Sequence, residues 1–377
     1  MKILVRTPNW LGDAVMALPA LRTLRNRLPN ADITLLARAW VADLYRRESC
    51  ADRVIVYPGV GGPRGWRERL KLARQLQRDR CDWALVFPNS WESALLPWAA
   101  RIPRRTGYER RGRGYLLTDR IAPPQRGEVP QHESFYYLEL LRRSGVIERL
   151  PEPSPILLSG IQQARSRGAG LFESLGLEGP VIGLSPGAQN SRAKQWPAGR
   201  FVQAAASLAG QLGAAVAVFG SAAERPLGRH VAAELRRHGC HAINLAGETT
   251  LEDFIALAAA CRVFLSNDSG AMHLASALGV PTVAVFGPTE WFATAPAGPR
   301  SVIVREPVEC SPCMLRDCPT DHRCMLRIPA ERVAKAALDL IEWDMEGGHT
   351  NQDLDSGSRE PGAARAHRAP EGGHRVL

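Results

Sequence analysis

Three segments of the chain combine charged and amide side chains with glycine, as ligand-binding loops do. The first runs from Arg6 to Asp13 and carries a guanidinium, an amide and an indole ahead of its carboxylate. A carboxylate in such a loop is suited to general-base chemistry. Asp13 could equally cap the helix that follows it, so the pattern alone leaves both roles open.

The other two segments have the character of anion-binding loops. Ser185 to Pro197 is small, polar and basic, and its Arg192 and Lys194 could neutralise a diphosphate, although solvated loop lysines are commoner. Phe264 to His273 passes from an apolar run into Asn-Asp-Ser-Gly and then a helical pattern. Backbone N–H groups at such a turn bind anions, and Gly270 permits close backbone approach. The alternatives here are an Asp or Ser helix cap and a core histidine.

These loops need strands and helices to position them, and the hydrophobic pattern predicts both in two separate halves. Short apolar strands alternate with helical segments, which indicates parallel sheets covered by helices on both faces. In such sheets ligands bind beyond the carboxyl ends of the strands, where the three loops would lie. The predicted strands are Lys2–Arg6, Ile33–Ala37, Arg53–Tyr57 and Trp83–Pro88 in the first half, and Val181–Ser185, Ala215–Phe219, Ala242–Leu245, Val263–Ser266 and Thr282–Phe286 in the second.

A proline-rich stretch from Leu150 to Pro155 separates the halves, since proline disrupts helix and sheet interiors. We therefore predict one α/β domain over residues 1–160 and a second over residues 161–343, the latter ending in a closing helix. Residues 344–377 are rich in Gly, Pro, Ser, Arg and His and have few apolar side chains. We expect them to form a disordered tail.

The amino-acid composition excludes several classes of protein. The 377 residues are 45% hydrophobic and show no repeat, which excludes collagen-like, coiled-coil and wholly disordered chains. The start lacks the order of a signal peptide, and apolar runs fall short of the ~20 residues needed to cross a bilayer. We expect a cytoplasmic protein. A net charge of +10 favours an anionic partner.

Two further clusters, one of arginines and one of cysteines, could be functional. Seven arginines lie between positions 101 and 120, and they form either a solvated face or a surface for carboxylates, phosphates or anionic lipid. Cys310, Cys313, Cys318 and Cys324 are dense enough for a structural Zn²⁺ site, the alternatives being a reduced loop or disulfides formed after purification.

Short motifs follow one another in a fixed order over most of the chain. They are Gly12-Asp13 with Met16-Ala-Leu-Pro-Ala-Leu21, Pro88-Asn-Ser90 with Ser93-Ala-Leu95, Arg105-Thr-Gly-Tyr108, Ala193-Lys-Gln-Trp-Pro197, Asn244-Leu-Ala-Gly-Glu-Thr249 and Asn267-Asp-Ser-Gly-Ala-Met-His273. Together they resemble the ADP-heptose:lipopolysaccharide heptosyltransferases of glycosyltransferase family 9. The segments at Pro88 and Asn244 favour the type II branch over type I.

The resemblance implies a GT-B fold, with two Rossmann-like domains facing across a cleft. It implies inverting transfer of L-glycero-D-manno-heptose from ADP-heptose to the first heptose of the lipopolysaccharide inner core, with no cofactor required for catalysis. The partners would be ADP-heptose, a lipid A-core acceptor and the anionic cytoplasmic face of the inner membrane, and no nucleic acid. Another GT-B nucleotide-sugar enzyme and, less favoured, a nucleic-acid-binding protein are the competing interpretations.

The same resemblance assigns roles to individual residues. Asp13 would be the general base and Lys194 would offset charge on the leaving diphosphate. The donor-binding residues would be Gln189, Asn190, Gly220, Ser221, Glu224, Asp268, Ser269, Gly270 and His273. The acceptor-binding residues, on the first domain, would be Arg6, Asn9, Asn89, Ser90, Arg104 and Arg105.

Overall fold

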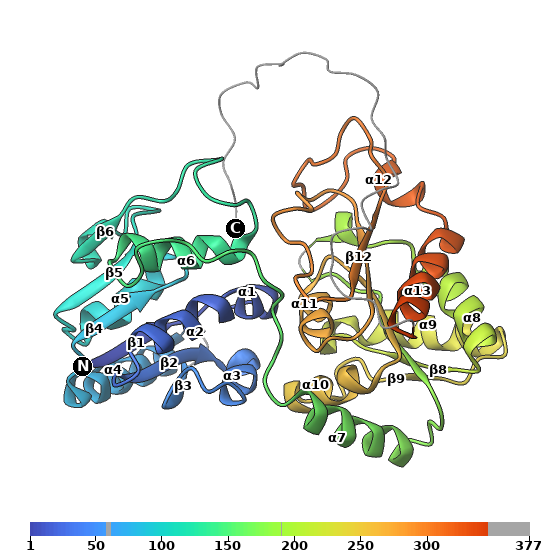
Figure 1. Ribbon diagram of the computed structural model, residues 1–377, viewed down its shortest axis with the longest axis horizontal. Helices are drawn as coiled ribbons and strands as arrows, with labels where there is room; N and C mark the ends of the chain where they lie inside the picture. Colours follow the sequence, from blue (N-terminus) through green and yellow to red (C-terminus); the bar gives the residue numbers. More distant parts are fainter. Residues whose placement is uncertain (58–61, 190, 346–377) are drawn as a thin grey trace.

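The computed structural model describes residues 1–57, 62–189 and 191–345. It contains two α/β units that lie side by side (Figure 1). The tail that we expected beyond residue 343 lies outside the described residues from position 346 onward. Among the helices that are described, none is both long and apolar enough to cross a membrane.

The first unit is built on a six-stranded parallel sheet with the order β3-β2-β1-β4-β5-β6. Its strands are β1 (Lys2–Arg6), β2 (Asp32–Arg38), β3 (Arg53–Tyr57), β4 (Trp83–Val86), β5 (Arg104–Tyr108) and β6 (Asp119–Ile121). Its helices are α1 (Leu11–Met16), α2 (Leu18–Arg27), α3 (Ala39–Arg46), α4 (Gly62–Asp79), α5 (Trp91–Ala99) and α6 (Glu133–Arg143).

Both faces of this sheet are buried, as the alternating side chains of β1 show. Ile3 and Val5 pack into one hydrophobic cluster, and Leu4 between them packs into another with Leu72 and Leu76 of α4. A strand buried on both faces is apolar throughout, and this explains why the sequence identifies β1 so readily.

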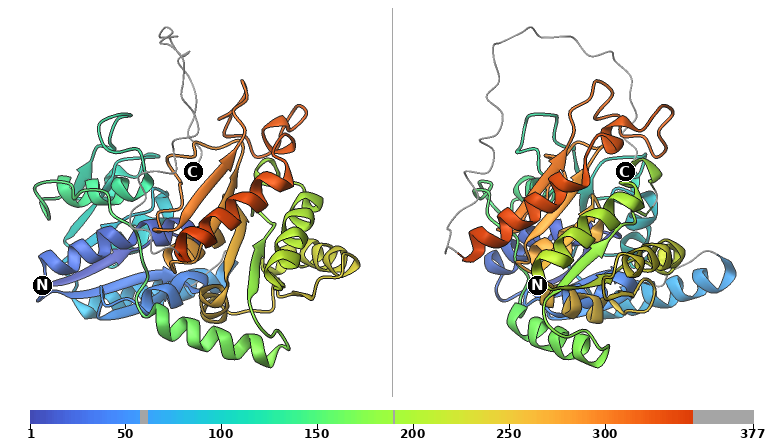
Figure 2. Two further views of the ribbon diagram at one scale, coloured as in Figure 1. Left: turned by 45° about the vertical axis from the view of Figure 1, so that its right-hand side comes forward. Right: turned by 90° about the vertical axis from the view of Figure 1, so that its right-hand side faces the viewer.

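The second unit repeats the plan with the order β12-β11-β10-β7-β8-β9, again all parallel. Its strands are β7 (Val181–Ser185), β8 (Ala215–Val218), β9 (Ala242–Asn244), β10 (Val263–Asn267), β11 (Thr282–Phe286) and β12 (Ser301–Arg305). Its helices are α7 (Ile161–Ser174), α8 (Ala198–Leu212), α9 (Arg225–Arg237), α10 (Leu251–Ala260), α11 (Gly270–Ala277), α12 (Arg323–Leu326) and α13 (Ala330–Met345). In Figure 2, α13 lies along the face of β10 to β12.

The two units meet through two pairs of helices. Helix α1 packs against α11, and α3 packs against α10. A Cβ added at Gly270 would lie 2.9 Å from Leu11 Cβ, so only glycine allows α11 to approach α1 this closely. The loops after β1 and β10 are thereby brought to the same place.

The doubly wound α/β prediction is confirmed for both halves. The sequence analysis missed β5, β6, β12, α5, α6 and α12, and β5 shows why. Strand β5 reads Arg-Arg-Thr-Gly-Tyr and carries little apolar pattern, although three of its five residues are buried. The domain limits at residues 160 and 343 stay an interpretation.

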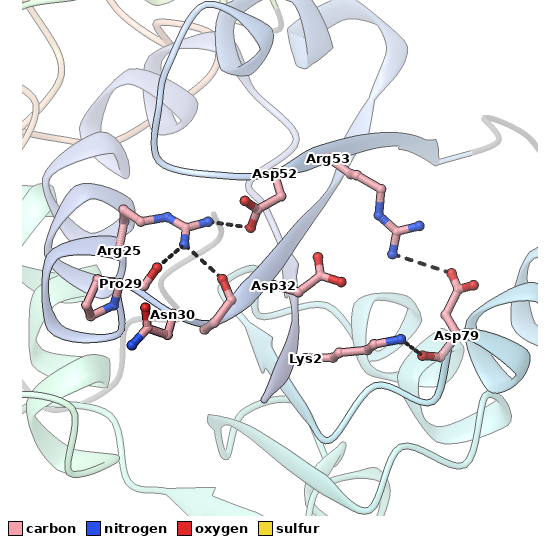
Figure 3. Close-up of a pocket in the computed structure, with 9 residues that line it drawn as sticks. Lys2, Arg25, Pro29, Asn30, Asp32, Asp52, Arg53 and Asp79 are labelled. Carbon is pink, nitrogen blue, oxygen red and sulfur yellow. Dashed lines mark hydrogen bonds and ion pairs between the residues drawn. The ribbon is translucent and has the colours of Figure 1, made fainter.

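A hollow lies at the amino ends of β1, β2 and β3, at the sheet edge opposite the loops described above (Figure 3). Its two arginines are paired within it: Arg25 contacts Asp52 at 2.5 Å and Arg53 lies 3.7 Å from Asp79. The backbone N–H of Ile33 also donates to Asp52 and lowers the pKa of that carboxyl. Each arginine of the hollow therefore has a carboxylate partner.

Candidate active site

Asp13 stands in the first turn of α1, directly after the loop from β1. The residue at the N-cap of this helix is Trp10, and no side chain makes a capping hydrogen bond there. The capping role that the sequence left open for Asp13 is therefore excluded, and its carboxylate is available for other contacts.

Two charged side chains of the second unit act electrostatically on Asp13. Lys194 and Asp268 form an ion pair, with Nζ 2.7 Å from Oδ2, and Thr289 Oγ1 donates to the same oxygen at 2.8 Å. Burial raises the pKa of Asp13 to about 6; Lys194 opposes this rise and Asp268 adds to it. The structure thus brings together the predicted base, the predicted diphosphate-binding lysine and the predicted nucleotide loop.

A pKa of about 6 suits a general base. At pH 7 most of the carboxyl is ionised, and yet it holds a proton far better than an exposed aspartate does. The environment of Asp13 therefore favours proton abstraction near neutral pH.

His273 lies one turn into α11, packed against α1. A Cβ at Gly12 would fall 2.8 Å from His273 Cδ2, so Gly12 leaves room for the imidazole. Only 4% of the His273 surface is exposed, and burial lowers its pKa to about 4. The ring is neutral at physiological pH and fills the space between the two helices.

Ser269 is the N-cap of α11, as one of the structural interpretations of this loop predicted. Its Oγ accepts from the N–H of Met272 at 3.4 Å and lies 3.0 Å from Ser266 Oγ. Since the Ser269 side chain is engaged in this way, the loop offers a ligand chiefly its backbone N–H groups and the positive end of the helix dipole.

Asn267 joins the loop after β7 to the end of β10, and the sequence gave no sign of this role. Its Oδ1 accepts from the N–H of Trp196 at 3.0 Å and its Nδ2 donates to the carbonyl of Pro186 at 2.8 Å. The indole of Trp196 is buried and donates to the carbonyl of Ile328. These bonds anchor the segment that carries Lys194.

The segment before α12 holds the Lys194 turn from the other side. The N–H of Ala193 donates to the carbonyl of Arg316 at 2.9 Å, and His322 Nε2 lies 2.7 Å from the carbonyl of Ala193. Arg192 pairs with Asp317 at 2.6 Å. The cysteine-bearing segment therefore positions Lys194.

The remaining donor-binding predictions lie around the loops after β7 and β8. Ser221 and Glu224 form a reciprocal capping box, in which Glu224 Oε2 accepts from both the N–H and the Oγ of Ser221 at 2.7 Å. Gly220 comes directly before Ser221, and Gln189 is exposed. Asn190 lies outside the described residues.

Four of the six acceptor-binding predictions gather at the carboxyl edge of the first sheet, near Asp13. Arg6 Nη2 donates to Asn9 Oδ1 at 2.5 Å. Asn89 Nδ2 donates to the hydroxyl of Tyr136 at 2.9 Å, and Ser90 caps α5. These residues follow β1 and β4, which pair directly in the sheet.

The structure places the other two, Arg104 and Arg105, at the opposite edge of the sheet, and their acceptor-binding role stays a prediction. They begin β5, and Arg104 pairs with Trp83 at the start of β4. Arg104 binds Asp119 at 2.7 Å and lies 4.1 Å from the Trp83 ring, and Arg105 donates to the carbonyls of Ile102 and Leu116. Their guanidiniums are engaged in contacts within the first unit.

The four clustered cysteines lie between the end of β12 and α12, with Cys324 inside α12. Among the described residues, no group of three or more His, Cys, Asp or Glu side chains is placed to hold a metal ion. All eight cysteines are free. Burial raises the pKa of the Cys324 thiol to about 11, and the three neighbouring cysteines contribute to the rise. Zinc binding stays a prediction.

Comparison with known proteins decides the family. Residues 69–323 match the model of glycosyltransferase family 9 (heptosyltransferase). The chain belongs to glycosyltransferase family 9. It is 36% identical over 312 residues to lipopolysaccharide heptosyltransferase 2 of Salmonella typhimurium, covering 81% of this chain and 88% of that protein. It is 35% identical over 316 residues to lipooligosaccharide heptosyltransferase 2 of Haemophilus influenzae, with the same coverage of each.

A solved member of the family has the same architecture. The structure of Escherichia coli ADP-heptose lipopolysaccharide heptosyltransferase II matches with a TM-score of 0.79 and 32% identity, over 92% of this chain and all of that one. This family 9 chain is therefore a GT-B glycosyltransferase, and the type II resemblance that its motifs suggested is confirmed.

Proposed function

We propose that this chain transfers heptose from ADP-heptose to the heptose already present on a lipopolysaccharide inner core. The observation that carries the proposal is the meeting of Asp13, on the first unit, with the Lys194–Asp268 pair of the second. A base on one side and a cation on the other are what transfer between an acceptor hydroxyl and a nucleotide sugar requires.

The transfer is a single displacement. The acceptor oxygen bonds to the anomeric carbon of heptose, the bond from that carbon to the β-phosphate oxygen breaks, and its electron pair leaves with ADP. Asp13 takes the proton of the attacking hydroxyl. Because attack and departure occur on opposite faces of the sugar, the anomeric configuration inverts.

Charge on the departing ADP is offset by the second unit. Lys194 is 27% exposed at its side chain and is held by Asp268, so its ammonium is positioned before the donor binds. The amino end of α11, which begins at Gly270, adds backbone N–H groups. These groups supply the positive charge that the reaction needs, and we expect transfer to proceed without a divalent cation.

The acceptor is anchored in lipid, and the first unit carries a face suited to a membrane surface. Five large aromatic side chains near its carboxyl edge are between 41% and 61% exposed: Trp10, Trp40, Trp66, Trp91 and Tyr115. Aromatic side chains of this kind favour the interface between headgroups and water, and the net charge of +10 favours anionic lipid. The proposal therefore places the enzyme at the cytoplasmic face of the inner membrane.

Mass spectrometry of products tests the proposal. The purified chain is incubated with ADP-heptose and either a core oligosaccharide bearing one heptose or the same core without heptose. We expect the first acceptor to gain one heptose and the second to stay unchanged. Addition only to the heptose-free core would indicate type I activity, and conversion of ADP-heptose without an acceptor product would refute transfer.

A further inference from the structure

The stretch that joins β12 to α12, which we call the 306–322 segment, contains no helix or strand of its own (Figure 1). Stretches of more than about 15 residues without secondary structure are uncommon in compact domains, and many of them are functional. Val308 is the only buried residue in the segment. Packing in the hydrophobic core therefore does not explain the course of the segment, and its polar contacts have to be considered.

The first set of contacts holds the turn that carries Lys194. The N–H of Ala193 donates to the carbonyl of Arg316 at 2.9 Å, and the carbonyl of Ala193 accepts from His322 Nε2 at 2.7 Å. That carbonyl belongs to the peptide bond between Ala193 and Lys194. The N–H of the same peptide donates to the carbonyl of Ser191 at 3.3 Å. His322 thus fixes one side of the peptide group from which the lysine side chain departs.

The second set of contacts holds the turn after β11. Ser311 Oγ donates to the carbonyl of Gly287 at 2.6 Å, and the N–H of Met314 donates to the carbonyl of Pro288 at 2.8 Å. The next residue of that turn is Thr289. The 306–322 segment therefore bonds to two turns that follow different strands of the second sheet.

The two turns meet at one carboxylate oxygen. Asp268 Oδ2 accepts from Lys194 Nζ at 2.7 Å and from Thr289 Oγ1 at 2.8 Å. The Asp268 side chain is 5% exposed, whereas that of Lys194 is 27% exposed. Because the four-carbon stem of lysine is flexible, the place of its ammonium depends on a fixed backbone as well as on this oxygen. The segment holds the backbone of both turns.

The backbone of His322 is held in a conformation that aims the ring. Its φ is 55°, in the left-handed region that residues other than glycine rarely adopt. Its carbonyl accepts from the N–H groups of Met325 and Leu326 at 3.0 Å, so the first turn of α12 secures this conformation. Backbone conformations of this kind persist only where the surrounding structure enforces them, and they are concentrated at functional sites.

We propose that His322 is a positioning residue for the diphosphate of the donor. Since a carbonyl oxygen only accepts, Nε2 carries the hydrogen of the bond to Ala193. Through that bond, His322 sets the place of the Lys194 ammonium behind the leaving ADP. The inference rests on the proposed function and adds a residue that acts on the donor without contacting it.

His322→Asn tests the proposal by calorimetry with ADP and with adenosine. Asparagine tolerates the left-handed backbone, but its amide ends about where Nδ1 lies and is too short to replace Nε2. We expect the affinity for ADP to fall by about 3- to 10-fold, from the loss of one hydrogen bond, and the affinity for adenosine to stay within about twofold. His238→Asn, at an exposed histidine that ends α9, is the matched control and should change neither affinity.

A double-mutant cycle with Lys194→Ala distinguishes positioning from general support of the fold. If His322 acts through Lys194, His322→Asn should cost less than about twofold in ADP affinity once the lysine is absent. The same fold loss in both backgrounds would overturn the proposal, because it would show that the two side chains act independently. Unchanged ADP affinity of the single variant would overturn it as well.

His322→Gln provides rescue by a conservative variant. The amide nitrogen of glutamine lies the same number of bonds from Cα as Nε2 does, so this variant should recover ADP affinity to within about threefold of the native value. An equal loss of ADP and adenosine binding in both variants would overturn the proposal, since it would show that His322 only supports the fold. Failure of the proposed function is seen separately, as native chain that yields no heptose-bearing product, because the binding measurements need no acceptor.

Discussion

Replacing Asp13 by asparagine should cost activity and increase stability. The pKa of Asp13 is raised from 3.8 to about 6, chiefly by burial. The folded state therefore holds this proton more tightly than the unfolded chain, and its stability falls as the pH rises from about 4 to about 6. Above that range the ionised, buried carboxylate costs up to about 3 kcal/mol, at 1.36 kcal/mol for each pKa unit.

An asparagine at position 13 avoids that cost and cannot accept the proton. We expect kcat to fall by about 10²- to 10⁴-fold, with the affinity for ADP-heptose little changed. The free energy of unfolding at pH 7.5 should increase by up to about 3 kcal/mol, and the gain should vanish near pH 4. In the native enzyme, kcat/KM should fall about tenfold for each pH unit below 6.

The assays are steady-state kinetics from pH 4.5 to 8 and denaturant unfolding at pH 7.5 and near pH 4. The matched control is Asp339→Asn, whose carboxylate is exposed on α13 and paired with Lys335, and it should change neither quantity appreciably. Near-normal turnover of the Asp13 variant would refute its role as base. Loss of turnover without any gain in stability would refute the electrostatic reasoning.

Three further predictions concern the donor site, the arginine run and the cysteines. Lys194→Ala should weaken ADP binding in calorimetry, because it removes the cation beside Asp268, and unaltered affinity would place the diphosphate elsewhere. Arg104→Glu should lower the free energy of unfolding by about 1 kcal/mol, because it breaks the half-exposed ion pair with Asp119. The acceptor KM should stay unchanged. A raised KM with normal stability would support the acceptor-binding role of Arg104 instead. Elemental analysis of reduced protein should find about one zinc per chain if the four clustered cysteines bind it, and none would remove that site. Activity should survive EDTA in either case, and loss restored by Mg²⁺ would contradict a metal-independent transfer.

The sequence was sufficient to locate the reacting loops because their strands are buried on both faces. Apolar strands such as β1 and β10 end abruptly in polar residues, and parallel topology puts all carboxyl ends at one edge. Asp13 and Asp268 follow from that rule alone. Their proximity depends on the packing of α1 against α11, which no local pattern encodes.

Arg104 and Arg105 show a limit of prediction from the sequence. A run of arginines reveals charge but not which edge of a sheet it faces, and β5 has too little apolar pattern to fix its direction or its limits. The contacts around the Tyr57 ring show the same limit in another way. Arg38, Arg69 and Glu92 come from three elements far apart in the chain, and only the fold brings them around one ring.

Asn267 is a further residue whose role could not be predicted from the sequence. The sequence indicated it as part of an anion-binding motif, but its amide serves to join two loops of the second unit. A buried amide that satisfies both a donor and an acceptor gives no periodic signal, because its partners are backbone atoms some 70 to 80 positions away.

The anomeric configuration of the product tests the central claim, a one-base displacement assisted by Asp13, most directly. The enzyme is supplied with ADP-heptose of β configuration and a one-heptose acceptor, and the new linkage is assigned from its one-bond carbon–proton coupling by nuclear magnetic resonance. A single base on the acceptor side, with the cation behind ADP, predicts an α linkage in all of the product. A β linkage would require a second displacement and a nucleophile that this account does not contain, and would contradict it.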